Sequence, residues 1–413
     1  MPNANLVRGL FSGENKAKKE LLVAKAGNGA PGLYLALKNG HHRAIAAYID
    51  GLVKANLSGS DLSQLFIAKA ADDSSGLWVA AKNGHCQAVA VYIQEVIKAG
   101  LKNPDLIQIL VSKDTNHTPI LHFLMKQGRA DEVKIYINGI LGSQLPISLK
   151  LEILSASNAQ GSSGLALAMK KGKFEVVDAF FDCIINSDLN DGSKKDLLIG
   201  DLLFYALLQG HSQAVTAYIN GILRLNLGKS DRKRVLFASS SQGERPGLRY
   251  AMENGHSQAV KAYIEGISKD PELIHELLEA GVLGLALLKG WHQAIAAYAQ
   301  AVLALGLDSV HIKRLFTAKS TLVIALKEGY DQAIVVYIEA VCTSGLDQND
   351  IKTLLSTVGL AAALEKGRVN AMKAYIQGVL NSGLSEGDKK DILMTPGLRG
   401  ELGVYLALKK TII

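Results

Sequence analysis

The sequence predicts an all-α protein folded as a solenoid of about nine similar helical repeats, curved to the right or to the left. Two observations support this fold class. The motif G-L-x-x-A-x-x-x-G-H-x-x-A-V-x-A-Y-I recurs along the chain, and its apolar residues follow the spacing of a helix face rather than the alternation of a strand. A single core rarely extends over 413 residues, so stacking of repeats explains how a chain of this length buries its apolar side chains.

A glycine inside the motif sets the spacing of the repeats. The intervals are 44, 44, 44, 38, 45, 35, 39 and 38 residues, and the glycines are Gly40, Gly84, Gly128, Gly172, Gly210, Gly255, Gly290, Gly329 and Gly367. A tyrosine column lies eight residues after the glycine, with Phe180 in one place: Tyr48, Tyr92, Tyr136, Tyr218, Tyr263, Tyr298, Tyr337 and Tyr375. A column this uniform meets the same surroundings in every repeat, and a stacked core is what we expect.

Each repeat is expected to contain three helices. The first runs from Gly32 to the turn glycine Gly40, which ends it because a tight turn favours positive φ. The second carries an apolar stripe that includes Ile45, Tyr48 and Leu52. The third follows capping residues, as in Ser58-Gly-Ser-Asp-Leu.

The ends of the chain are read as incomplete repeats. Residues 1–30 are expected to form a partial or capping repeat, residues 31–402 the array, and residues 403–413 a partial repeat that begins with Gly403-Val-Tyr-Leu-Ala-Leu. These ends are typical either of caps or of a chain cut from a longer protein.

The first two helices of every repeat resemble the ankyrin repeat. The run Leu77-Trp-Val-Ala-Ala-Lys-Asn-Gly-His85 is similar to the family pattern Leu-His-x-Ala-Ala-x-x-Gly-His, and Thr118-Pro-Ile-Leu-His122 is similar to its opening segment. An ankyrin repeat has about 33 residues and a β-turn finger. Because this chain adds about ten residues that look helical, we do not expect that finger as a binding surface.

The resemblance implies a protein-interaction scaffold, and helix-extended arrays of this kind resemble those of bacterial effector proteins delivered into host cells. We therefore expect a cytoplasmic protein, or one that a bacterial secretion system delivers. The second reading is that the array targets an enzyme linked to it. Catalysis by the array itself is not expected.

Composition limits the other classes of function. The three cysteines, Cys86, Cys183 and Cys342, lie far apart, which argues against a disulfide framework or a zinc site. No apolar stretch is long enough to span a membrane. Four histidines follow turn glycines, where a structural role is expected: His41, His85, His211 and His256. The sequence therefore predicts no catalytic residue, no cofactor and no metal.

The candidate partner-binding residues lie just before the turn glycines of the first four repeats. They are the pairs Lys38-Asn39, Lys82-Asn83, Lys126-Gln127 and Lys170-Lys171, with Tyr34, Trp78 and His122 one turn earlier. If these positions line a concave face, as they do in ankyrin arrays, they form a basic ridge for an acidic or phosphorylated protein. The alternative is a solvated lysine face above half-buried aromatic side chains.

Nucleic-acid binding is a further alternative, in which the aromatic column stacks on single-stranded bases. The aromatic column ends after three repeats and the lysines after four, and the formal net charge is only +7. We therefore expect a protein partner rather than a nucleic acid. The oligomeric state is left open.

Overall fold

The computed structural model describes residues 30–55, 57–70, 74–114, 116–198, 200–237 and 246–396. These residues are helical and contain no strand longer than an isolated bridge. They divide into two compact blocks. The N-terminal block holds the described residues up to 198 together with 224–226, and the C-terminal block holds 200–223 and those from 227 onward. Both predicted partial repeats, 1–30 and 403–413, lie outside the described residues except for Ala30.

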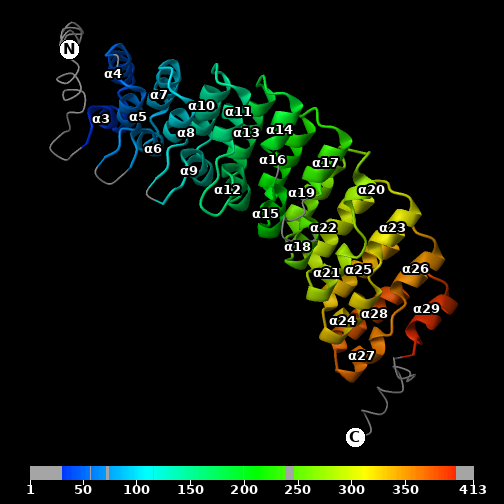
Figure 1. Cartoon of the computed structure of the whole chain (residues 1–413). Coiled ribbons are helices and arrows are strands. Elements are labelled where there is room, and N and C mark those ends of the chain that lie inside the picture. Colours follow the sequence, from blue (N-terminus) through cyan, green and yellow to red (C-terminus); the bar gives the residue numbers. More distant parts are fainter. Residues whose placement is uncertain are drawn as a thin grey trace. The chain divides into compact units, whose positions relative to one another are not determined.

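The N-terminal block contains four repeats of three helices each (Figure 1). The first helices are α3 (Gly32–Lys38), α6 (Gly76–Lys82), α9 (Ile120–Gln127) and α12 (Gly164–Lys170). The second helices are α4 (His42–Lys54), α7 (Cys86–Lys98), α10 (Ala130–Leu141) and α13 (Phe174–Ile185). The third helices are α5 (Gly59–Ile67), α8 (Asn103–Val111), α11 (Ile147–Leu154) and α14 (Asp191–Asp196).

The C-terminal block continues the pattern over five repeats. Its first helices are α15 (Leu202–Gln209), α18 (Gly247–Glu253), α21 (Val282–Lys289), α24 (Lys319–Glu328) and α27 (Gly359–Glu365). Its second helices are α16 (Ser212–Leu223), α19 (Ser257–Ile267), α22 (His292–Leu303), α25 (Asp331–Cys342) and α28 (Val369–Leu380). Its third helices are α17 (Lys229–Leu236), α20 (Ile274–Leu277), α23 (Ser309–Phe316), α26 (Gln348–Leu355) and α29 (Glu386–Leu393).

Helices of the same rank pack against each other from one repeat to the next within each block. First helices contact first helices, as α3 does α6, and second helices contact second helices, as α4 does α7. Third helices form a further row, as in α5, α8 and α11. The predicted all-α solenoid of three-helix repeats is therefore confirmed for the described residues.

The turn glycines adopt the backbone conformation that their spacing predicts. All nine have φ between 65° and 90°, the left-handed region that other residues enter at a cost. Each lies in a connection of two or three residues between a first helix and a second helix. In the second repeat, for example, the His85 N–H donates to the Ala80 carbonyl oxygen at 3.0 Å across this turn.

The buried tyrosine column joins neighbouring repeats by hydrogen bonds. The hydroxyl on a second helix donates to a carbonyl oxygen near the end of the preceding third helix, where intrahelical partners run out. The pairs are Tyr92 with Phe66, Tyr136 with Leu110 at 2.8 Å, Tyr263 with Leu236 at 2.9 Å, Tyr337 with Phe316 at 3.1 Å and Tyr375 with Leu355 at 2.8 Å. Burial raises the pKa of these hydroxyls, so they remain protonated donors.

Tyr298 departs from this pattern. Its hydroxyl is buried and has no hydrogen-bond partner among the described residues. The preceding third helix, α20, has only four residues and belongs to the shortest repeat interval, 35 residues. The carbonyl oxygens of His275 and Leu278 in and after α20 instead accept from Arg314 Nη2, at 3.5 and 3.3 Å.

Two loops between a third helix and the next first helix contain a short antiparallel bridge. Lys69 pairs with Ser75, and Lys113 pairs with Pro119. Within the second loop, the Ile120 N–H donates to the Ser112 carbonyl oxygen at 3.0 Å. In these two places the added third helix is therefore followed by a short bridged loop.

Candidate functional site

The candidate lysines lie at the carboxyl ends of the four first helices of the N-terminal block. The lysine row, as we call it here, consists of Lys38, Lys82, Lys126 and Lys170 with their neighbours Asn39, Asn83, Gln127 and Lys171. All eight residues are exposed. Because the first helices pack side by side, the structure brings these eight residues together along one edge of the block (Figure 1).

The backbone beneath the lysine row is held by the following repeat. The Lys38 carbonyl oxygen accepts hydrogen bonds from His85 Nε2 at 2.9 Å and from Asn83 Nδ2 at 3.0 Å. The Lys82 carbonyl oxygen accepts a longer one from Arg129 Nη2 at 3.4 Å. These lysines therefore have a fixed backbone and a side chain in solvent.

In several repeats the residue after the turn glycine reaches back to the preceding repeat. The His85 ring lies against Gly40, where an added Cβ would be 2.8 Å from its Nδ1. His256, Trp291 and Arg368 make the equivalent bond in the C-terminal block, to the carbonyl groups of Leu208, Glu253 and Lys327. The structural role predicted for His85 and His256 is confirmed, although they bond the preceding turn and do not cap their own helix.

Three lysines of the row carry positive charge that no described acidic side chain pairs with. Lys38, Lys82 and Lys126 form no ion pair with another residue that the structure describes. The Lys82 amine lies 5.3 Å from the centroid of the Trp78 ring, a cation–π distance. Exposed like charges at a repeating position favour an anionic partner.

The aromatic column lies beneath this row and is largely inaccessible. Tyr34 is buried and its hydroxyl lies 3.2 Å from Ser74 Oγ. His122 is 1% exposed, and its Nε2 lies 2.6 Å from the Ser162 carbonyl oxygen, so this nitrogen carries the proton. Trp78 is half-buried, with its ring 4.8 Å from that of Phe123.

Two consequences follow for the candidate site. Tyr34 and His122 are too buried to stack on a base, so Trp78 is the one member of this aromatic column that is partly accessible. Burial also lowers the pKa of His122, because a proton on its partnerless Nδ1 would place a charge in the core. Of the sequence-predicted residues, the lysine row and part of Trp78 are accessible to a partner.

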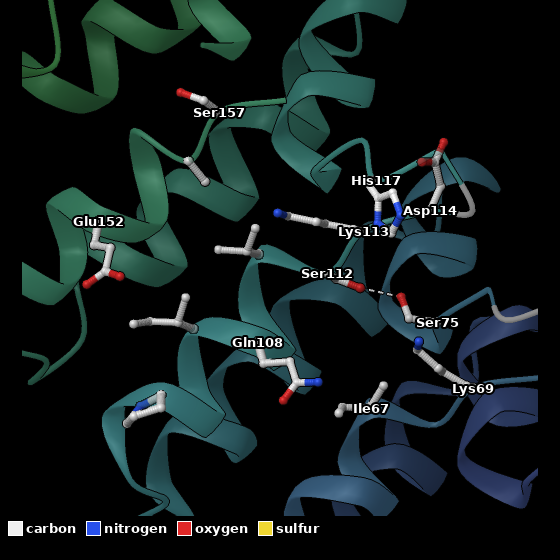
Figure 2. A pocket seen from close by; sticks show the side chains of 14 residues that line it. Ile67, Lys69, Ser75, Gln108, Ser112, Lys113, Asp114, His117, Glu152 and Ser157 are labelled. Atoms are coloured by element: carbon white, nitrogen blue, oxygen red, sulfur yellow. Dashed lines mark hydrogen bonds between the residues drawn. The ribbon is translucent and has the colours of Figure 1, made fainter. Parts of the chain in front are cut away.

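A pocket of about 510 Å³ lies elsewhere in the N-terminal block, among α5, α8, α11 and the loops that follow them (Figure 2). Its lining includes Lys113 and Glu152, neither of which the sequence singled out. The sequence feature that marks this pocket is weak. It is the apolar Ile107 on α8, where the third helices α23 and α26 have Lys313 and Lys352.

The cysteines provide little reactive thiolate. Cys183 is buried, and burial raises its pKa to about 11. Cys86 and Cys342 are half-buried with pKa values raised mainly by burial. Among the described residues, no group of three or more His, Cys, Asp or Glu side chains is placed to hold a metal ion.

Within the same part of the chain, no helix combines the length and apolar character needed to cross a membrane.

Comparison with known proteins gives matches among solved structures alone. No protein-family model matches the sequence, and no curated protein gives a significant match. Among solved structures, the chain is similar to an ankyrin repeat domain from Acinetobacter baumannii AYE, with 16% sequence identity and a TM-score of 0.35. The likeness covers 57% of this chain and 96% of that one. The described residues form a helical repeat solenoid with an exposed basic row on its N-terminal block.

Proposed function

We propose that this chain is a protein-interaction scaffold whose lysine row binds an acidic or phosphorylated protein. The observation that carries the proposal is the combination at Lys38 and Lys82: the next repeat fixes each backbone carbonyl, and the side chain is exposed and unpaired. A row of charges on a fixed backbone is pre-organised, so binding costs less conformational entropy than binding by a mobile loop.

The strength of such a site depends on several repeats acting together. An exposed ion pair contributes only about 0.2–1 kcal/mol. A partner that reaches one lysine gains little, whereas one that lies along the row gains several such contacts at once. We therefore propose an extended acidic segment of the partner as the ligand.

The C-terminal block lacks this single-sign row. At the positions of Lys38, Lys82, Lys126 and Lys170 it carries Leu208, Glu253, Leu288, Lys327 and Glu365. Alternation of apolar, acidic and basic side chains gives no uniform potential. We propose that the C-terminal block contributes less to recognition of an acidic segment.

The proposal extends to the setting in which the scaffold acts. The ankyrin-like pattern and the resemblance to effector arrays support a protein that works in the cytoplasm, including that of a host cell. The scaffold would act by holding its partner, either on its own or as the targeting region of an enzyme linked to it.

Site-specific photocrosslinking tests the location of the site. A benzoylphenylalanine replaces Gln127 in one variant and Asn254, the equivalent residue of the C-terminal block, in the other. We expect a specific protein adduct at position 127 and little or none at position 254. Equal adducts at both positions, or none at 127, would show that the lysine row is not the binding surface.

A further inference from the structure

The pocket among the third helices has both apolar and charged side chains in its lining. Five of the lining residues are apolar: Ile67 at the end of α5, Pro104, Ile107 and Val111 on α8, and Ala156 after α11. Pro104 is exposed and Ile107 is half-buried. Its volume, about 510 Å³, is within the range of sites that take a drug-sized ligand or a few side chains.

At one position that lines the pocket, α8 differs from the third helices α23 and α26. Registers can be matched through the carbonyl group that accepts the tyrosine hydroxyl: Leu110 in α8, Phe316 in α23 and Leu355 in α26. Three residues before it stand Ile107, Lys313 and Lys352 respectively.

Both of those lysines pair with the next third helix. Lys313 pairs with Asp350, and Lys352 lies 2.7 Å from carboxylate oxygens of both Asp388 and Asp391. Ion pairs therefore close the groove between neighbouring third helices at these two places in the C-terminal block. Beside α8 an isoleucine leaves the groove open.

The rim of the pocket carries charges on opposite sides. Figure 2 shows the Lys113 side chain extending toward the middle of the pocket, with Lys69 near Ser75 on one side and Glu152 on the other. Asp114 also lines it, but its Oδ1 accepts the N–H groups of Asn116 at 2.9 Å and Thr118 at 2.8 Å.

Lys113 is exposed and forms no ion pair with a residue that the structure describes. Lys113 therefore offers an ammonium group to a ligand carboxylate that binds beside the apolar lining residues.

The pocket also lies within reach of the lysine row. Ser75, which lines the pocket, is the N-cap of α6, and Lys82 is the last residue of the same helix. Seven helical residues span about 10 Å, a distance that three or four residues of extended peptide cover.

We propose that this pocket takes an apolar side chain of the acidic partner segment, with a neighbouring carboxylate on Lys113 and further acidic residues along the lysine row. This inference rests on the proposed function, and it adds an anchor that electrostatics alone does not supply. The third helix creates the pocket, so it has no counterpart in a two-helix repeat.

Peptide selection tests the proposal. A phage-displayed library of random 12-residue peptides is selected against the purified full chain, and the consensus peptide is titrated by fluorescence anisotropy. We expect a consensus with one apolar position flanked by Asp or Glu. Because one apolar group in a pocket changes affinity about 10- to 200-fold, Ile107→Lys should weaken binding at least about tenfold.

The matched control is Ile147→Lys, which adds the same charge at an exposed isoleucine of α11 outside the pocket lining. We expect it to bind as the wild type does. Ile107→Lys introduces the residue found at this position in α23 and α26, and circular dichroism checks its folding. Lys113→Glu, a change at an exposed side chain, gives a second measure if Ile107→Lys is destabilised, and it should also weaken binding.

The outcomes separate this inference from the proposed function. If Ile107→Lys and Lys113→Glu leave the affinity for acidic peptides unchanged but Lys82→Glu/Lys126→Glu lowers it, the pocket proposal is overturned and the lysine row is not. If neither pair of substitutions lowers the affinity, or if the selection enriches no acidic peptide, both the pocket proposal and the lysine-row proposal are overturned.

Discussion

The Tyr136 hydroxyl on α10 donates a 2.8 Å hydrogen bond to the Leu110 carbonyl oxygen near the end of α8. The bond is buried and joins the second helix of one repeat to the third helix of the repeat before it. Its equivalents recur in both blocks, so a single side-chain type joins helices of different rank across successive boundaries.

Removal of this hydroxyl is expected to destabilise the N-terminal block. Tyr136→Phe leaves the Leu110 carbonyl group buried without its partner, at a cost of about 1–3 kcal/mol. The control is Tyr298→Phe, because the Tyr298 hydroxyl has no partner and its loss should be neutral or slightly stabilising. Urea unfolding followed by circular dichroism measures both variants. Equal destabilisation by the two changes would show that the hydrogen bond is not the source of the effect.

The spacing of residues predicted some of these features and not others. Turn glycines and the tyrosine core follow from local periodicity. The nine glycines have the predicted positive φ, and the tyrosine column is buried from Tyr92 onward, whereas Tyr48 is half-buried. The hydroxyl partner of Tyr136 does not follow, because it belongs to a helix 26 residues earlier whose register only the fold defines. His122 similarly looked accessible, and it is buried because the loop holding Ser162 covers it.

The shortest repeat also has an ion-pair network that its sequence did not indicate. The shortest repeat has the four-residue helix α20, yet it is held by Arg232, whose guanidinium contacts Asp270 at 2.7 Å and Glu272 at 3.0 Å. This network joins residues about 40 apart, so no local motif indicates it. The lysine row remains a prediction from sequence, since exposure is compatible with a binding role without demonstrating one.

A methyl group at a turn glycine should destabilise more where an aromatic ring covers the turn. Gly255 has φ of 74°, and an added Cβ would lie 2.7 Å from Cδ2 of Trp291. Gly306 has φ of 64° and open space around it. The left-handed backbone should destabilise both alanine variants by about 1–2 kcal/mol. Gly255→Ala should be destabilised further because Trp291 must move. Thermal unfolding of the two variants compares them, and a Gly306→Ala loss as large as that of Gly255→Ala would refute the stacking contribution.

Stability of the N-terminal block should fall as the pH drops below about 6.5, the usual value for histidine. Burial lowers the pKa of His122 in the folded state. Below about pH 6.5 the unfolded chain therefore binds a proton at this histidine while the folded chain does not, which favours unfolding. Each pH unit between the two pKa values then costs about 1.4 kcal/mol. His122→Gln should flatten the dependence of the urea midpoint on pH between 6.5 and 5.

The control for this titration is His117→Gln, which changes an exposed histidine of the same block. That variant should keep the wild-type slope because His122 is still present. An unchanged slope in His122→Gln would mean that another group causes the loss of stability.

The most direct test of the lysine row is the affinity of the protein that crosslinks at position 127, measured by titration calorimetry. Lys82→Glu/Lys126→Glu replaces attraction by repulsion at two exposed contacts of up to about 1 kcal/mol each. We expect affinity to fall about tenfold or more, with a weaker salt dependence than the wild type shows. Lys289→Glu/Lys327→Glu makes the same charge change on exposed residues of the C-terminal block and should leave the affinity unchanged. Equal affinity in all three proteins, or an equal loss in both variants, would contradict the account.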